Sequence, residues 1–259
     1  MNRPALVATV LVASAGFAAA VVLPAVAVAG STGTTTTETA TTTTTPKSPP
    51  AKTKIESKFP AAGGFLVHTV PIRKTPNPNS PVIKVLHDFR PDFRPQEILA
   101  LGKQIGSDGK AWYRVSIPMR PNGTYGWIPA NVVSLSPTKG QINIDLGSRT
   151  IDLFWNGKHV YHAGVAIGAP GRETPIGHYF VAARFVPYHD TFLGVFAVET
   201  SAYSKLTEWP GGGVVGIHGT SLPQLIGQAV SHGCVRVKNS TAEKLKRYAP
   251  LGTPIWIKK

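Results

Sequence analysis

The second half of the chain is dominated by alternation of apolar and polar residues. Residues 142–146 alternate strictly, a Gly-Ser-Arg turn follows, and residues 150–155 return as a second segment. The pair Asn156–Gly157, a strong signal for a two-residue hairpin turn, leads into residues 158–167. Because alternation is the period of a half-buried strand, these segments are predicted to form a β-meander. Further strands are predicted at 178–184, 192–200, 214–218 and 253–257.

Two short helical segments are predicted within this β-rich pattern. Residues 240–243 (Ser-Thr-Ala-Glu) have the form of a capping box, in which the two end side chains satisfy backbone N–H groups at a helix start. The helix is predicted to run to Tyr248, with Ala242, Leu245 and Tyr248 on one face. A helical turn is also predicted at 221–226.

Residues 59–137 contain short apolar segments separated by turn residues, which predicts a small β-barrel. Asn122–Gly123 is the expected turn between two segments that alternate bulky and small residues. The strand-like segments lie at 64–68, 72–76, 81–86, 97–102, 110–115 and 125–129.

The aromatic and glycine positions of this first unit carry a resemblance. The sequence Trp112-Tyr113-Arg114-Val115, followed by Gly126-Trp127-Ile128 and Asn131-Val132-Val133, resembles a bacterial SH3-like domain. The resemblance implies a role in binding the cell wall or in positioning a catalytic partner. The alternative is that both tryptophans are simply core residues. Residues 89–95, rich in Pro, Arg and Phe, depart from the SH3-like pattern and have no assigned role.

The N-terminus has the organisation of an export segment. Asn2-Arg3 precedes an apolar stretch, and Ala27-Val28-Ala29 before Gly30 has the small residues of a cleavage site. Residues 1–29 are therefore predicted to be a signal peptide, with an uncleaved membrane anchor as the alternative. Residues 30–58 are rich in Thr and Pro, which predicts an extended disordered spacer. Either way, the remainder is expected to be secreted into the cell envelope.

Charge narrows the choice of partners. The chain carries 27 basic and 13 acidic residues, a net charge of +14. Such a surface favours anionic polymers, and an anionic cell wall or membrane surface agrees with export. The sequence shows no zinc-finger spacing, basic helix or RNP-like strand, so nucleic acid is not expected as a partner. A membrane contact is expected only through an uncleaved N-terminal segment.

Candidate chemistry is concentrated in two motifs, Ile217-His218-Gly219-Thr220 and Ser231-His232-Gly233-Cys234-Val235-Arg236. Cys234 is the single cysteine of the chain, so no intramolecular disulfide is possible. A thiol becomes a strong nucleophile as thiolate, and a nearby imidazole can accept its proton. Arg236 places a positive charge near the sulfur, which would favour thiolate and could bind a substrate carboxylate.

The residues before Cys234 are suited to a sharp turn. Gly233 allows backbone conformations and close approach that other residues resist. The backbone N–H groups of His232, Gly233 and Cys234 could then serve as an oxyanion hole.

The spacing H-G-T, about a dozen residues, then S-H-G-C-V-R resembles the signature of the L,D-transpeptidase catalytic domain. Residues 174–179 (Thr-Pro-Ile-Gly-His-Tyr) match the family's upstream T-P-x-G-x-[FY] element. The resemblance covers residues 140–259. It implies a β-rich catalytic domain, so the predicted fold is mainly β: a small SH3-like barrel followed by a catalytic domain with one or two short helices.

The resemblance also implies an activity. Members of the family cleave the bond after the third residue of a peptidoglycan tetrapeptide stem, release D-alanine, and hold the stem as a cysteine thioester. An amine of a second stem then forms a 3→3 cross-link, and no metal or organic cofactor is required. The implied partners are donor and acceptor stem peptides, with anionic cell-wall polymers as further candidates.

Within this scheme Cys234 is the expected nucleophile and His218 the expected base. The Gly219 carbonyl would hold the other ring N–H of His218, where some family members carry serine. His232 is the competing base, but it lies two residues from the cysteine, where direct side-chain contact is awkward. Ser231 and Thr220 are expected hydrogen-bonding neighbours, and Arg236 would bind a stem carboxylate.

Three alternatives remain at this point. His218, His232 and Cys234 could be zinc ligands, although the absence of a clear fourth ligand argues against a structural zinc site. The protein could bind the wall without catalysis. Water could also resolve the thioester in place of an amine, which would make the enzyme an L,D-carboxypeptidase.

Overall fold

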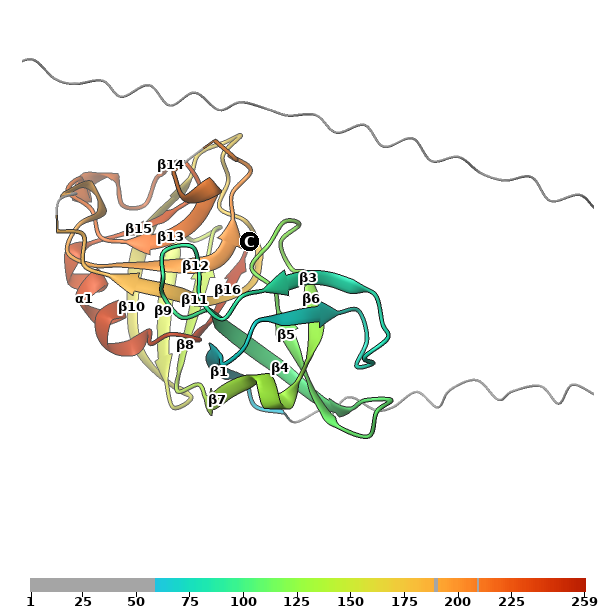
Figure 1. Cartoon of the computed structure of the whole chain (residues 1–259). Coiled ribbons are helices and arrows are strands. Elements are labelled where there is room, and N and C mark those ends of the chain that lie inside the picture. Colours follow the sequence, from blue (N-terminus) through green and yellow to red (C-terminus); the bar gives the residue numbers. More distant parts are fainter. Residues whose placement is uncertain (1–58, 189–190, 209) are drawn as a thin grey trace, which may run out of the picture. The chain divides into compact units, whose positions relative to one another are not determined.

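The described part of the protein is built from two β-sheets and one α-helix (Figure 1). The structure, a computed structural model, describes residues 59–188, 191–208 and 210–259. The predicted signal segment and spacer lie outside these residues. The mainly β fold class is confirmed. Within the described ranges, no helix is long and apolar enough to cross a membrane.

The first sheet has the strand order β3-β2-β6-β5-β4-β1-β7, and its neighbours pair antiparallel. Its apolar core includes Ile72, Ile98 and Ile128. Trp112 and Trp127 are also buried, as expected of core residues. The strands are β1 (Ala62–Leu66), β2 (Val70–Arg73), β3 (Val82–Leu86), β4 (Glu97–Ile105), β5 (Ala111–Ser116), β6 (Tyr125–Pro129) and β7 (Val133–Pro137). The SH3-like assignment of this unit stays a prediction.

The second sheet has the order β14-β10-β15-β13-β12-β11-β16-β8-β9, and β10 also pairs with β9, so the sheet closes on itself. Closure surrounds a core of Ile, Leu and Val side chains. The strands are β8 (Gly140–Asp145), β9 (Thr150–Trp155), β10 (Lys158–Gly168), β11 (Gly177–Phe185), β12 (Ala197–Tyr203), β13 (Val214–His218), β14 (Ala229–Ser231), β15 (Val235–Val237) and β16 (Pro254–Lys258).

The predicted meander is confirmed at β8, β9 and β10. Asn156 and Gly157 have φ values of 50° and 74°, the left-handed conformation that a type I′ hairpin turn requires. The strand predicted at 192–200 begins only at Ala197, because residues 191–193 form a 3₁₀ turn. The helical turn predicted at 221–226 is present as a 3₁₀ turn at Pro223–Leu225.

The capping box at 240–243 is wrong. Helix α1 (Asn239–Tyr248) begins one residue earlier, so Ser240 already lies inside the helix. Lys238 occupies the N-cap position, and no side-chain hydrogen bond caps the helix start. Ala242 and Leu245 are fully buried against the second sheet, as the apolar face predicts.

The two sheets touch directly. Leu99 of β4 packs with Phe180 and Ala182 of β11. Backbones also meet at Gly63 and Gly252, where a Cβ built on Gly63 would lie 2.7 Å from the Gly252 Cα, so only glycine fits. Two hydrogen bonds also join the sheets: Asn122 Nδ2 donates to Tyr203 O at 2.7 Å, and Tyr203 N donates to Asn122 Oδ1 at 3.0 Å.

Candidate active site

Two neighbouring parallel strands bring the central motifs together. Strand β13 pairs with β15 so that Ile217 lies opposite Val235 and His218 opposite Arg236. Ile217, Val235 and Val237 are fully buried in the core. Because side chains alternate along a strand, the residues next to these three in sequence face the opposite side, toward a cavity.

Cys234 and His218 flank a common space on this cavity side. A Cβ built on Gly216 would lie 3.8 Å from Cys234 Sγ and 3.8 Å from His218 Cδ2. Gly216 therefore leaves open the gap that the thiol and the imidazole share. Its own N–H donates to Cys234 Sγ at 3.3 Å, which fixes the position of the sulfur.

Burial decides the protonation state of Cys234. Burial raises the pKa of the thiol, whereas the Gly216 N–H and the charge of Arg236 act in the opposite direction. The net shift is upward, so the thiol is neutral at rest. Arg236 favours thiolate, as the sequence suggested, but the effect of burial is larger. A base is needed to activate the sulfur.

His218 is buried, and its orientation is fixed. Its Nδ1 lies 2.6 Å from the Gly219 carbonyl oxygen, which can only accept, so Nδ1 carries the proton. The neutral ring then has its lone pair on Nε2. This is the backbone contact that the sequence suggested for Gly219.

Asn239, the first residue of α1, fixes the loop behind His218, and no sequence motif indicated this role. Its Oδ1 accepts from Val195 N at 3.3 Å and from Thr220 N at 3.2 Å. A Cβ on Gly219 would lie 2.3 Å from the same oxygen. A side chain at 219 would therefore have to displace the Asn239 carboxamide from this contact.

Ser231 and Gly233 shape the turn that presents the cysteine. Ser231 Oγ donates to Cys234 O at 2.5 Å and accepts from Gly233 N at 3.1 Å. Gly233 has φ 115°, and a Cβ there would lie 2.9 Å from Ser204 Cβ, so the position needs glycine. The Gly233 N–H is therefore already bonded, unlike the oxyanion donor that the sequence suggested.

The hydroxyls of Ser231 and Thr220 both serve the backbone. Thr220 is buried, and its Oγ1 accepts from Leu222 N at 3.0 Å. Both hydroxyls therefore have hydrogen-bond partners within the protein. A contact of either hydroxyl with substrate stays a prediction.

The rings of His232 and His218 have different hydrogen-bond partners. Arg172 Nη1 donates to His232 Nε2, so this ring accepts at Nε2 and is neutral. Partial burial and the charges of Arg172 and Arg236 lower the pKa of His232. An Nε2 held by a guanidinium is a poor base for the thiol, which favours His218 in that role.

Arg236 is a buried cation in the cavity wall. It is 7% exposed, and its guanidinium lies over the Phe192 ring, 4.5 Å from the centroid. Its Nε has no hydrogen-bond partner, and burial lowers its pKa. In the described part of the chain, no carboxylate lies within 4.0 Å of it. The side chain is thus suited to an incoming anion.

Phe192 contacts both functional groups. Besides its contact with Arg236, its ring centroid lies 6.1 Å from that of His218. It belongs to the 3₁₀ turn Thr191–Leu193 rather than to the strand predicted there. Because a strand was predicted here, the sequence analysis did not identify Phe192 as a residue of the site.

These side chains line a cavity of about 920 Å³. The second sheet contributes His218, His232, Cys234 and Arg236. The first sheet contributes a second wall, formed by residues 84–87, 89–92 and 96 together with Pro118. This wall contains most of the Pro-, Arg- and Phe-rich segment whose role the sequence left open.

Arg90 attaches that segment to the second sheet. Its Nη2 forms an ion pair with Glu199 Oε2 of β12 at 2.5 Å, and Nη1 donates to Ala182 O at 3.4 Å. Both side chains of the pair are largely buried. The segment is therefore part of the site as the structure describes it.

The side chains whose donor atoms could together bind a metal ion lie outside this cavity. In the described ranges, the group with converging His, Cys, Asp or Glu donors is Asp152, His159 and His162. The alternative set of His218, His232 and Cys234 does not form such a group.

The region of the second sheet and α1 is similar to known proteins. Residues 139–257 match the family model of the YkuD L,D-transpeptidase catalytic domain. A putative L,D-transpeptidase YkuD of Bacillus subtilis is 30% identical over 116 residues, which cover 45% of this chain and 64% of that protein. The Bacillus licheniformis protein of the same description is 30% identical over 117 residues, with the same coverage.

The matched region spans slightly less than two thirds of these curated relatives. Among solved structures, an L,D-transpeptidase from Mycobacterium tuberculosis H37Rv is similar, with 15% identity, a TM-score of 0.42, and coverage of 75% of this chain and 98% of that one. Residues 139–257, which carry the paired strands of the site, are therefore similar to the L,D-transpeptidase catalytic domain.

Proposed function

We propose that this protein is a cysteine L,D-transpeptidase of peptidoglycan, which transfers a stem acyl group to an amine of a second stem and forms 3→3 cross-links. The observation that carries the proposal is the placement of Cys234 and His218 next to Gly216, facing one cavity with buried Arg236.

Acylation begins with a neutral thiol, because burial raises the pKa of Cys234. His218 Nε2 accepts the thiol proton as the sulfur attacks the carbonyl carbon of the third stem residue. The C–N bond to D-alanine then breaks, and the imidazolium returns the proton to the leaving amine. The products of this step are free D-alanine and a thioester on Cys234.

Deacylation follows the same path in reverse. An acceptor amine attacks the thioester, His218 removes a proton from the attacking nitrogen, and the proton finally returns to the cysteine sulfur. Water in place of the amine would give an L,D-carboxypeptidase. The cavity volume of about 920 Å³ lies at the upper end of ordinary ligand sites, which suits a site for two stems.

Charge stabilisation involves two parts of the same motif. We assign the tetrahedral oxyanion to the backbone N–H of Cys234, because Ser231 already holds the Gly233 N–H. Arg236 binds a stem carboxylate, because it is a buried guanidinium facing the cavity with an unpaired Nε.

The export segment and the basic surface support an extracytoplasmic location at the cell wall. The net charge of +14 favours association with anionic wall polymers. The SH3-like unit would then position the catalytic domain and close one side of its cavity.

Product analysis tests this function. The full chain is incubated with a tetrapeptide stem, with and without an amine-bearing acceptor stem, and products are separated by mass. Release of D-alanine together with a cross-linked dimer supports the transpeptidase, and tripeptide without dimer supports the carboxypeptidase. Unchanged substrate with the wild-type chain, or equal turnover by C234A, would contradict the proposal.

A further inference from the structure

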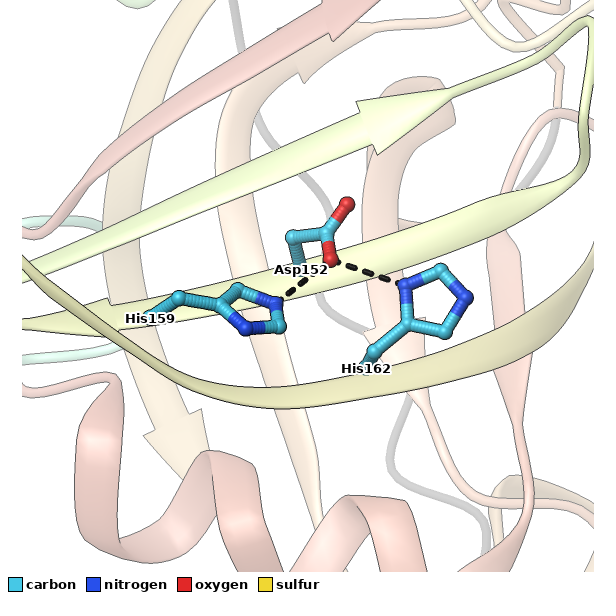
Figure 2. A group of neighbouring side chains, drawn as sticks. All are labelled: Asp152, His159 and His162. Carbon is cyan, nitrogen blue, oxygen red and sulfur yellow. Dashed lines mark hydrogen bonds and ion pairs between the residues drawn. The ribbon is translucent and has the colours of Figure 1, made fainter.

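The outer face of the β9–β10 hairpin carries a histidine–carboxylate cluster that acyl transfer does not use. Asp152 Oδ1 lies 2.7 Å from His159 Nε2 and 2.8 Å from His162 Nδ1 (Figure 2). The ligand atoms of the three side chains all lie within 4.8 Å of one another. None of the three residues lines the active-site cavity.

A β-bulge brings the two histidines to the same face. Residues three apart on a regular strand point to opposite faces, as the period of two requires. In β10 the register shifts between His159 and Tyr161, so that His159 pairs with Phe154 and His162 with Asp152. The extra residue reverses the alternation, and both rings then converge on the carboxylate of the neighbouring strand.

Several contacts limit the movement of the cluster. The His159 ring packs edge-on against Phe154, with centroids 5.2 Å apart. The tight Asn156–Gly157 turn connects the two strands directly before His159.

We propose that Asp152, His159 and His162 form a binding site for one divalent transition-metal ion of the zinc class. Imidazole nitrogens and a carboxylate are ligands that Zn²⁺ accepts, and three protein ligands leave a fourth position for water. In a tetrahedral site with bonds of about 2.0 to 2.1 Å, neighbouring ligand atoms lie about 3.3 Å apart. Each ring nitrogen therefore needs to retreat from Oδ1 by roughly 0.5 Å.

Metal binding fixes which nitrogen of each ring carries the proton. A coordinating nitrogen must offer its lone pair, so His159 carries its proton on Nδ1 and His162 carries its proton on Nε2 in the bound state. The side chains are 30%, 50% and 56% exposed for Asp152, His159 and His162, so an ion reaches them from solvent. A bound ion would link β9 to β10 at the pairing that closes the second sheet.

Equilibrium dialysis of the full-length chain against Zn²⁺, followed by metal analysis, tests the site. All chains carry C234A, which removes the thiol as a competing ligand. We expect one equivalent of Zn²⁺ per chain, with affinity lowered at least about tenfold by H162Q and by D152N. The melting temperature should rise with Zn²⁺ in the parent chain and stay constant in both variants.

H178Q is the matched control, because His178 is another exposed histidine of the same sheet, on β11 and stacked on Trp256. It should bind Zn²⁺ as the parent does. Equal melting temperatures of all chains without metal would show that the substitutions leave the fold intact. Absence of a Zn²⁺ equivalent in the parent, or binding unchanged by H162Q and D152N, would overturn the proposal.

Discussion

The active-site cavity has two walls that are built in different ways. The wall from the second sheet carries His218, Cys234 and Arg236, and the register of β13 and β15 fixes their positions. Most of the wall from the first sheet belongs to the connection between β3 and β4, which Arg90 attaches to the second sheet through one ion pair and one hydrogen bond. The family match covers only the second sheet and α1.

We infer that the wall from the second sheet, the strand wall, positions the reacting groups, and that the wall from the first sheet, the loop wall, shapes the cavity. Strand pairing fixes the positions of the thiol and the base to within a few tenths of an ångström. Little further conformational entropy is then lost when they reach the geometry that proton transfer requires. A loop wall can vary in sequence without disturbing that geometry. We therefore expect substitutions in the strand wall to abolish turnover, and substitutions in the loop wall to change mainly substrate binding.

The largest effect is expected in the strand wall. H218Q removes the base that the neutral thiol requires, and should lower the rate of acylation by about 10² to 10⁴. H232Q should have a much smaller effect, because Arg172 already occupies its Nε2. Single-turnover release of D-alanine measures both variants, with H162Q on the far hairpin as the control. A larger loss in H232Q than in H218Q would reverse the assignment of the base.

An intermediate effect is expected where the two sheets meet. Glu97 is buried on β4 beside Gly252, and burial raises its pKa to about 7 despite a hydrogen bond from Gly64. The folded state therefore binds a proton more tightly than the unfolded state. This contribution to stability is complete below pH 4.5, and it is lost as the pH rises through about 7.

E97Q tests this statement, because an amide cannot ionise. The wild-type free energy of unfolding should fall by up to about 3 kcal/mol between pH 4.5 and 8 from this group, and E97Q should remove that part of the slope. Denaturant titrations across this pH range measure it. Parallel pH profiles for the two chains would show that Glu97 is ionised in both states.

The smallest effect is expected in the loop wall. R90A removes the ion pair with Glu199 that attaches the loop wall, and should raise KM several-fold while kcat changes little, because the substrate loses a fixed wall but no reacting group. K258A, which removes an exposed ion pair with Asp145, is the matched control and should leave KM unchanged. A loss confined to kcat would place Arg90 in the chemistry rather than in the wall.

The sequence predicted the strand wall much better than the loop wall. Cys234, His218 and Arg236 belong to one signature of two short motifs, and the alternation around them predicted which neighbours enter the core. Phe192, Asn239 and Arg90 were missed, because each reaches the site through contacts between residues far apart in sequence. The Asp152–His159–His162 cluster was missed for a related reason, since only the bulge in β10 places both rings on one face.

Local signals failed where a tertiary contact competed with them. The capping box at 240–243 was overridden because Asn239 starts the helix and bonds to the loop behind His218. The predicted oxyanion donor at Gly233 was lost to the Ser231 hydroxyl. The net pKa of the cysteine depended on burial, which a sequence does not quantify.

The most direct test of the central claim is the intact mass of the full-length chain after mixing with a tetrapeptide stem in the absence of acceptor. We expect an adduct equal to the stem minus D-alanine, located on Cys234 by peptide mapping, absent in C234A and discharged by an added amine. A folded chain with a titratable thiol that forms no adduct and releases no D-alanine would contradict it.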